Sequence, residues 1–137
     1  MEPQDLAARY VAVWMEPDAG LRRQGIERLF TESGRHVLEP PEEVRAAADR
    51  LGIIGPAFEA RGYDAIEKRV STSYDDFIAK QGFTFRPSGV ARRLEDVVTF
   101  EWEAVMAADG TVVGGGIEFL QLGEDGRIET DYMFPNR

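Results

Sequence analysis

The sequence VVTFEWEAVMAADGTVVGGGIEFLQL, residues 97–122, decides the fold class of this chain. Its first ten residues alternate, so that one face of an extended segment carries Val98, Phe100, Trp102, Ala104 and Met106. Such a period of two predicts a β-strand that is buried on one face. The Asp109-Gly110 pair is a strong hairpin signal, and residues 111–122 are therefore expected to return as an antiparallel strand.

Strands are also expected on both sides of this hairpin. Turn residues at 124–126 precede a last strand over 127–134. Another strand begins at 83–86, and Pro87-Ser88-Gly89 is expected to interrupt it. The second half of the chain therefore predicts an antiparallel meander.

The first half of the chain is mainly helical. Apolar residues recur at helical spacing over residues 6–14 and 21–30, and more weakly over 42–51. A further helix is expected to begin at Asp64, which can cap it, and to end at Gly82. A short strand is expected over 35–38 and a loop over 52–62, in which Ile53, Ile54 and Phe58 pack on another element. Helices followed by a meander predict an α+β fold with the helices on one face of the sheet. We expect the curved sheet to wrap around the N-terminal helices as a cone with an internal pocket.

Composition narrows the possible functions. The chain has 137 residues, which suits a single domain over 1–137, and a net charge of −9, which argues against nucleic acid and anionic membrane partners. There are no cysteines, so disulfides and thiolate sites are excluded. No apolar run approaches the roughly 20 residues of a membrane span, and the N-terminus lacks the basic start of a signal peptide. We expect a cytoplasmic protein without a metal or redox cofactor.

Glu118 is the most informative candidate site residue. Alternation places it on the same strand face as Leu120 and Leu122. A carboxyl on such a face tends to stay protonated or to find a hydrogen-bond donor, because burying an unpaired charge is costly. A neutral carboxylic acid can donate a hydrogen bond to a developing oxyanion. The alternative is that the strand twists and Glu118 reaches solvent or an arginine.

Two other polar residues lie where they could join a site. Tyr10 is on the apolar face of the first helix, where it could instead be a core tyrosine with its hydroxyl at the rim. Glu39 lies where the short strand meets Pro40-Pro41, and the alternative for it is a solvated strand end.

His36 and Asp131 carry weaker signals. His36 is the single histidine, and neither of the common paired-histidine metal motifs is present, which favours a structural or rim role. Strict alternation puts Asp131 with Arg127 and Glu129 on a solvated face. His36 is also a candidate pocket-lining residue, and six further residues could line the pocket or fill the core: Trp14, Tyr74, Phe77, Phe100, Trp102 and Met133.

Three segments together resemble bacterial ketosteroid isomerases. They are Arg9-Tyr10-Val11-Ala12 with an acidic turn at Asp18, Val37-Leu38-Glu39-Pro40, and Ile117-Glu118-Phe119 leading to Gly126-Arg127-Ile128. The chain is thereby similar to the SnoaL-like group of the nuclear-transport-factor-two-like superfamily, whose cone is also called cystatin-like. The resemblance covers nearly the whole chain except an extension at about 42–62, which could form a lid.

The resemblance implies roles for individual residues. Tyr10 and Glu118 would be the two oxyanion donors and Glu39 the general base. The family has Asp at the latter two positions, and the extra methylene of Glu moves each carboxyl by about an ångström, which can cost on the order of 100-fold in rate. The resemblance also turns Asp131 toward the pocket as an acid or base, and a β-bulge before it would reconcile this with the alternation.

Three functions are compatible with these residues. The first is cofactor-independent proton transfer on a small apolar carbonyl or polyketide-like molecule, of isomerase or cyclase type, or a hydrolase reaction. The second is a pocket that binds an apolar ligand without catalysis. The third is an interaction module, and in each case a homodimer through the sheet is expected.

Overall fold

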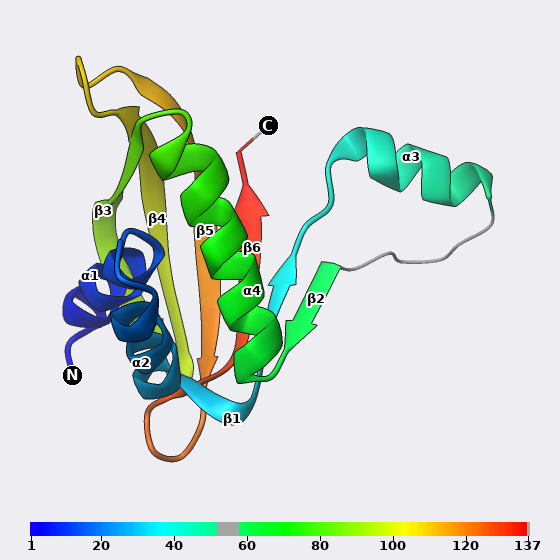
Figure 1. Ribbon diagram of the computed structural model, residues 1–137. Helices are drawn as coiled ribbons and strands as arrows, with labels where there is room; N and C mark the ends of the chain where they lie inside the picture. Colours follow the sequence, from blue (N-terminus) through cyan, green and yellow to red (C-terminus); the bar gives the residue numbers. More distant parts are fainter. Residues whose placement is uncertain (52–57, 137) are drawn as a thin grey trace.

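One curved, unclosed sheet of six strands forms the body of the molecule, in the order β2-β1-β6-β5-β4-β3 (Figure 1). The computed structural model describes residues 1–51 and 58–136. The strands are β1 (Phe30–Leu38), β2 (Phe58–Arg61), β3 (Phe83–Leu94), β4 (Val97–Met106), β5 (Val112–Leu122) and β6 (Ile128–Pro135). All neighbours are antiparallel except β1 and β6, which are parallel.

Helices cover one face of this sheet. They are α1 (Pro3–Trp14), α2 (Ala19–Leu29) and α4 (Tyr63–Ser73), and α4 continues into the π-helix η1 (Tyr74–Ala79). Helix α3 (Glu42–Arg50) stands apart from them beyond β1 (Figure 1). The core lies between α1, α4 and the inner face of the sheet, where Tyr10, Phe100 and Leu120 are buried. The predicted α+β architecture, with helices on one face of a curved sheet, is confirmed.

The predicted break in β3 is wrong. The strand runs through Pro87 without ending, and a register shift against β4 between Ser88 and Arg92 absorbs the irregularity. Proline is tolerated there because β3 is the last strand in the sheet order and, among the described strands, pairs with β4 alone.

Two helix boundaries also differ from expectation. Gly62, at a φ of +85°, precedes the first turn of α4, and the Asp64 carboxylate accepts from Arg23 at 2.8 Å instead of capping the helix. The final turns before Gly82 are π-helical. Such segments are rare and frequently occur at functional sites.

The first strand is longer than predicted, and part of the expected loop is a strand. β1 begins at Phe30, and β2 pairs with it from Arg61 opposite Arg35 to Phe58 opposite Leu38. The expected packing of Ile53 and Ile54 lies outside the described residues. Within the described part of the chain, no helix has the length and apolarity to span a membrane.

Candidate functional site

A largely apolar cavity of about 530 Å³ lies between the helices and the sheet. Five of the seven residues predicted to line a pocket do so: Trp14, His36, Phe77, Trp102 and Met133. Tyr74 instead packs its ring under the Arg22 guanidinium, 4.6 Å away, and Phe100 is a core residue against the ring of Tyr10. Arg69, Phe83 and Phe85 also line the cavity, and sequence reasoning missed them.

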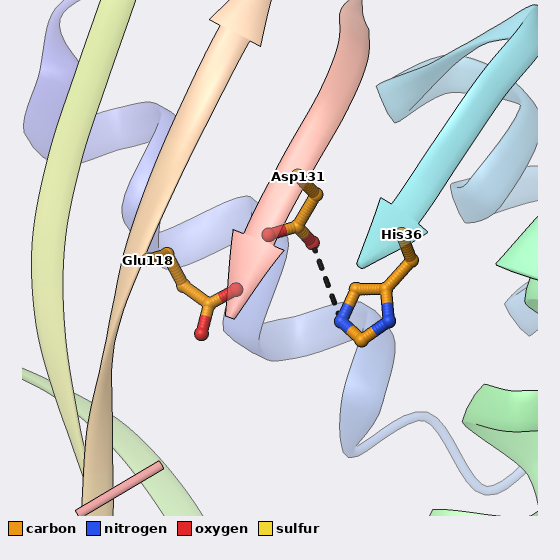
Figure 2. A group of neighbouring side chains, drawn as sticks. All are labelled: His36, Glu118 and Asp131. Carbon is orange, nitrogen blue, oxygen red and sulfur yellow. Dashed lines mark ion pairs between the residues drawn. The ribbon is translucent and has the colours of Figure 1, made fainter. Parts of the chain in front are cut away.

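Four polar residues are buried beside this cavity, and Figure 2 shows three of them pointing toward one another. Tyr10, His36, Glu118 and Asp131 are each at most 2% exposed and form what we call the acid cluster. The Tyr10 hydroxyl oxygen is 2.8 Å from Oε1 of Glu118 and also contacts Oδ2 of Asp131. Nε2 of His36 is 3.6 Å from the same Asp131 oxygen (Figure 2).

Trp102 connects the acid cluster to the cavity. Its indole lines the cavity, and its Nε1–H donates to Oε2 of Glu118 at 2.8 Å. Trp102 lies opposite Gly116 in the sheet, and a Cβ at that glycine would stand 2.7 Å from the indole. Gly116 thus leaves room for the indole. The three glycines at 114–116, which match no phosphate-binding loop, were the available sequence signal for this close approach.

A β-bulge brings Asp131 into the cluster. Ile128 pairs with Leu122 and Thr130 with Gln121, so Glu129 has no residue opposite it. The extra residue reverses the alternation, and Asp131 is fully buried. The expectation of a solvated Asp131 is therefore wrong, whereas Glu118 follows the simple alternation of its strand.

Counting protons shows that at least one carboxyl of the cluster is neutral. The Tyr10 hydroxyl has one proton but contacts two carboxyl oxygens, so one of these contacts needs a proton from a carboxyl group. Burial, followed by the nearby charge of Asp131, raises the pKa of Glu118 well above its ordinary value of 4.5. Burial and the two acids likewise raise the pKa of the Tyr10 phenol. We therefore place the second proton on Glu118, whose pKa is raised by burial and by the charge of Asp131.

The resulting hydrogen bonds run in one direction. With the second proton on Glu118, Trp102 donates to Oε2 of Glu118, Tyr10 donates to Asp131, and the Glu118 proton makes the 2.8 Å contact with the Tyr10 oxygen. Tyr10 is the one donor to the Asp131 side chain within the described residues, and a hydrogen bond to an ionised carboxyl is charge-assisted and strong. One oxygen of Asp131, Oδ1, and Nε2 of His36 have no hydrogen-bond partner among the described residues.

His36, Glu118 and Asp131 each offer a potential metal-ligand atom, all within 4.8 Å of one another. The donors already present argue against a cation there. Trp102 and Tyr10 contact both oxygens of Glu118 and one of Asp131, and a cation would require Glu118 to lose its proton. The arrangement therefore suits proton sharing better than metal binding.

The structure does not bring Glu39 to the acid cluster. His36 and Leu38 line the cavity, so alternation along β1 turns Glu39 to the other side. Glu39 lines a second depression with Pro40 and Pro41, and its carboxylate is 3.1 Å from Nη2 of Arg45. Of the four predicted catalytic residues, Tyr10, Glu118 and Asp131 are in mutual contact and Glu39 is not.

Comparisons with known proteins agree with this architecture. No protein-family model matches the sequence, and no curated protein matches it. A candidate isomerase of the SnoaL-like family from Agrobacterium tumefaciens str. C58 has a similar structure, with a TM-score of 0.78, 22% sequence identity and 100% coverage of both chains.

Two further solved structures extend the likeness. An NTF2-like protein of unknown function from Exiguobacterium sp. 255-15 has a TM-score of 0.62 at 21% identity, covering 96% of this chain and 98% of its own. A candidate polyketide cyclase from Sinorhizobium meliloti has a TM-score of 0.60 at 12% identity, covering 97% and 99%. At such identities the likeness shows the fold, and the chain has the fold of the SnoaL-like, nuclear-transport-factor-two-like proteins.

Proposed function

We propose that the cavity binds a small, largely apolar carbonyl or polyketide-like molecule, and that the acid cluster catalyses cofactor-independent proton transfer on it. The observation that carries this proposal is the bond from Trp102, a cavity-lining residue, to the buried acid Glu118. This hydrogen bond connects a residue of the cavity wall directly to the hydrogen-bonded acid cluster. The candidate SnoaL-like isomerase and the candidate polyketide cyclase among the structural neighbours support the same class of chemistry.

Three members of the acid cluster take part in the chemistry of this proposal. Asp131 accepts a proton from the carbon next to the substrate carbonyl and returns it to another carbon of the same molecule. Glu118 and Tyr10, both neutral, donate hydrogen bonds to the oxygen on which negative charge develops. Glu39, which resemblance alone suggested as the base, has no part because it lies outside the cavity.

The proposal requires a movement of side chains. Glu118 and Asp131 have no exposed surface, so the substrate must displace the indole of Trp102 or the imidazole of His36 to reach them. The same burial favours a second candidate function, which is ligand binding without catalysis. In that case the acid cluster would only stabilise the cavity wall.

Hydrogen–deuterium exchange separates these two functions. A panel of small cyclic ketones is incubated with the protein in D₂O, and NMR follows deuterium uptake next to the carbonyl. Catalysis predicts uptake that Asp131→Asn and Tyr10→Phe abolish and that Glu39→Gln leaves unchanged. Binding of these ketones without any enzyme-dependent uptake would contradict catalysis and support the second candidate. Mass spectrometry of molecules that co-purify with the protein would then identify the ligand class.

We also propose that the chain forms a homodimer through the outer face of the sheet. Phe119, Tyr132 and Phe134 lie on the face opposite the helices and are 36–40% exposed. The rings of Phe119 and Phe134 pack edge to face 5.8 Å apart. Sedimentation velocity is expected to show a dimer that Phe119→Glu dissociates, and a monomeric wild-type protein would contradict this.

A further inference from the structure

Arg69 joins helix α4 to the ring of His36. Its Nη1 lies 2.9 Å from Nδ1 of His36, 3.0 Å from the His36 carbonyl oxygen and 2.9 Å from the carbonyl oxygen of Phe58. These contacts hold the guanidinium against β1 and β2 together. Because the two carbonyl oxygens fix Nη1, the contact with the imidazole has a defined position.

The contact decides which nitrogen of His36 carries its proton. Nη1 has two protons for the three acceptors around it, so at least one N–H group is shared between acceptors. A guanidinium has only donors and stays protonated in proteins, so Nη1 cannot accept a hydrogen bond and Nδ1 can face it only as an acceptor. A neutral imidazole has one N–H group, which is then at Nε2. Nε2 points toward Oδ2 of Asp131, 3.6 Å away (Figure 2).

We infer that Arg69 is a positioning residue that holds His36 as a neutral imidazole with its proton on Nε2, so that His36 turns an N–H group toward Asp131, 3.6 Å away, and is not the base of the acid cluster. Protonation of Nδ1 would place two donors head to head at 2.9 Å. The lone pair of Nε2 is occupied by the proton, which also prevents this nitrogen from binding a metal. In the proposed reaction, Asp131 is therefore the group that accepts the substrate proton.

The other groups around His36 are consistent with this state. Asp131 from β6 is the acidic neighbour, Arg69 from α4 is the cationic one, and the ring of Trp14 from α1 packs 5.3 Å away. Tyr10 and Glu118 lie beyond Asp131 and are neutral. Burial holds the pKa of His36 below its ordinary value of 6.5, while Asp131 raises it and Arg69 lowers it. The cation and the carboxylate lie on either side of an uncharged ring.

The single histidine makes this inference directly measurable, because long-range ¹H–¹⁵N NMR of the labelled full chain shows one imidazole. We expect a protonated Nε2 and an unprotonated Nδ1 at neutral pH, with a titration midpoint below 6.5. Arg69→Met is expected to move the midpoint upward and to allow a proton on Nδ1. Arg69→Lys is expected to keep the wild-type tautomer, because an ammonium also only donates.

Lys68→Met is the matched control, because it removes an exposed cation from the neighbouring position of the same helix. It is expected to leave the tautomer and the midpoint unchanged. A proton on Nδ1 in the wild-type protein, or an unchanged midpoint in folded Arg69→Met, would overturn the inference. If Arg69→Met does not fold, the wild-type spectrum and Arg69→Lys still decide. The part that His36 and Arg69 play in catalysis rests on the proposed function, whereas the NMR measurement of the His36 tautomer does not. The tautomer assignment and the proposed function can therefore fail independently.

Discussion

The hydroxyl oxygen of Tyr10 lies 2.8 Å from Oε1 of Glu118, although the two residues are 108 positions apart in the sequence. Helix α1 supplies the phenol and β5 the carboxyl, and both are buried where the helix crosses the inner face of the sheet. The acid cluster therefore forms only when the helical and sheet halves of the chain come together. Its protonation states are a property of the folded protein, and they lead to measurable consequences.

The stability of the Glu118→Gln variant relative to the wild-type protein is expected to increase as pH rises. The folded-state pKa of Glu118 is raised, so its stabilising contribution is complete below the ordinary value of 4.5 and is lost as pH rises toward the folded-state pKa. Glu118→Gln stays neutral and can preserve both hydrogen bonds. The difference in unfolding free energy should shift toward the variant by up to about 1.4 kcal/mol per pH unit. Urea unfolding from about pH 5 to about pH 8 measures it, and a difference that does not change with pH would show an ionised Glu118.

Replacing Trp102 with Phe should destabilise the protein through the acid cluster. The indole Nε1–H is the donor to Oε2 of Glu118, and its loss leaves a buried carboxyl oxygen unpaired, at a cost of about 1–3 kcal/mol. Trp14→Phe is the matched control, since Trp14 also lines the cavity but contacts Tyr10 and His36 through its ring. Thermal and urea unfolding of both variants provide the comparison. Equal losses would mean that aromatic packing alone is responsible.

Two neighbouring glycines should respond differently to the same substitution. A Cβ at Gly116 would stand 2.7 Å from Trp102 and 2.9 Å from the Phe134 carbonyl oxygen, whereas at Gly114 it would meet nothing within 4 Å. Gly116→Ala is expected to cost about 1–3 kcal/mol by overpacking. Gly114→Ala is expected to stay within about 0.5 kcal/mol of wild type.

Fluorescence locates the effect of the Gly116 substitution. In a Trp14→Phe background Trp102 is the one remaining tryptophan. Its emission should change with Gly116→Ala and not with Gly114→Ala. A wild-type spectrum for the Gly116 variant would contradict the close packing of the indole on that glycine.

Arg22 should be important for stability although it forms no ion pair with any described residue. It is 5% exposed, its Nε and Nη2 donate to the Glu16 carbonyl oxygen, and its Nη1 donates to Ser71. Arg22→Met leaves these acceptors unpaired and is expected to cost about 1–3 kcal/mol. Arg28→Met removes an exposed arginine from the same helix and should change stability by less than about 0.5 kcal/mol. Similar losses in the two variants would show that the buried contacts of Arg22 contribute little.

The periodicity of the chain by itself determined the fold class and the burial of one acid. Alternation over residues 97–122 predicted two strands and most of their inner faces, because a β-strand turns every second side chain the same way. A register shift between Ala104 and Val105 interrupts the alternation and buries both residues. Glu118 follows that rule without interruption. Tyr10 follows the corresponding rule for a helix, in which residues three and four apart share a face.

Only the tertiary structure decided which acids meet. A single unpaired residue, Glu129, reverses the facing of Asp131, and whether a bulge forms depends on the pairing of β6 with β5, which no pattern within β6 records. Glu39 was expected in the site, but it lies outside the cavity because the direction of β1 turns its side chain away. The tautomer of His36 depends on Arg69, 33 positions away on another element. Local spacing fixes the direction in which a side chain points, whereas contacts between distant segments fix what it meets and which proton it carries.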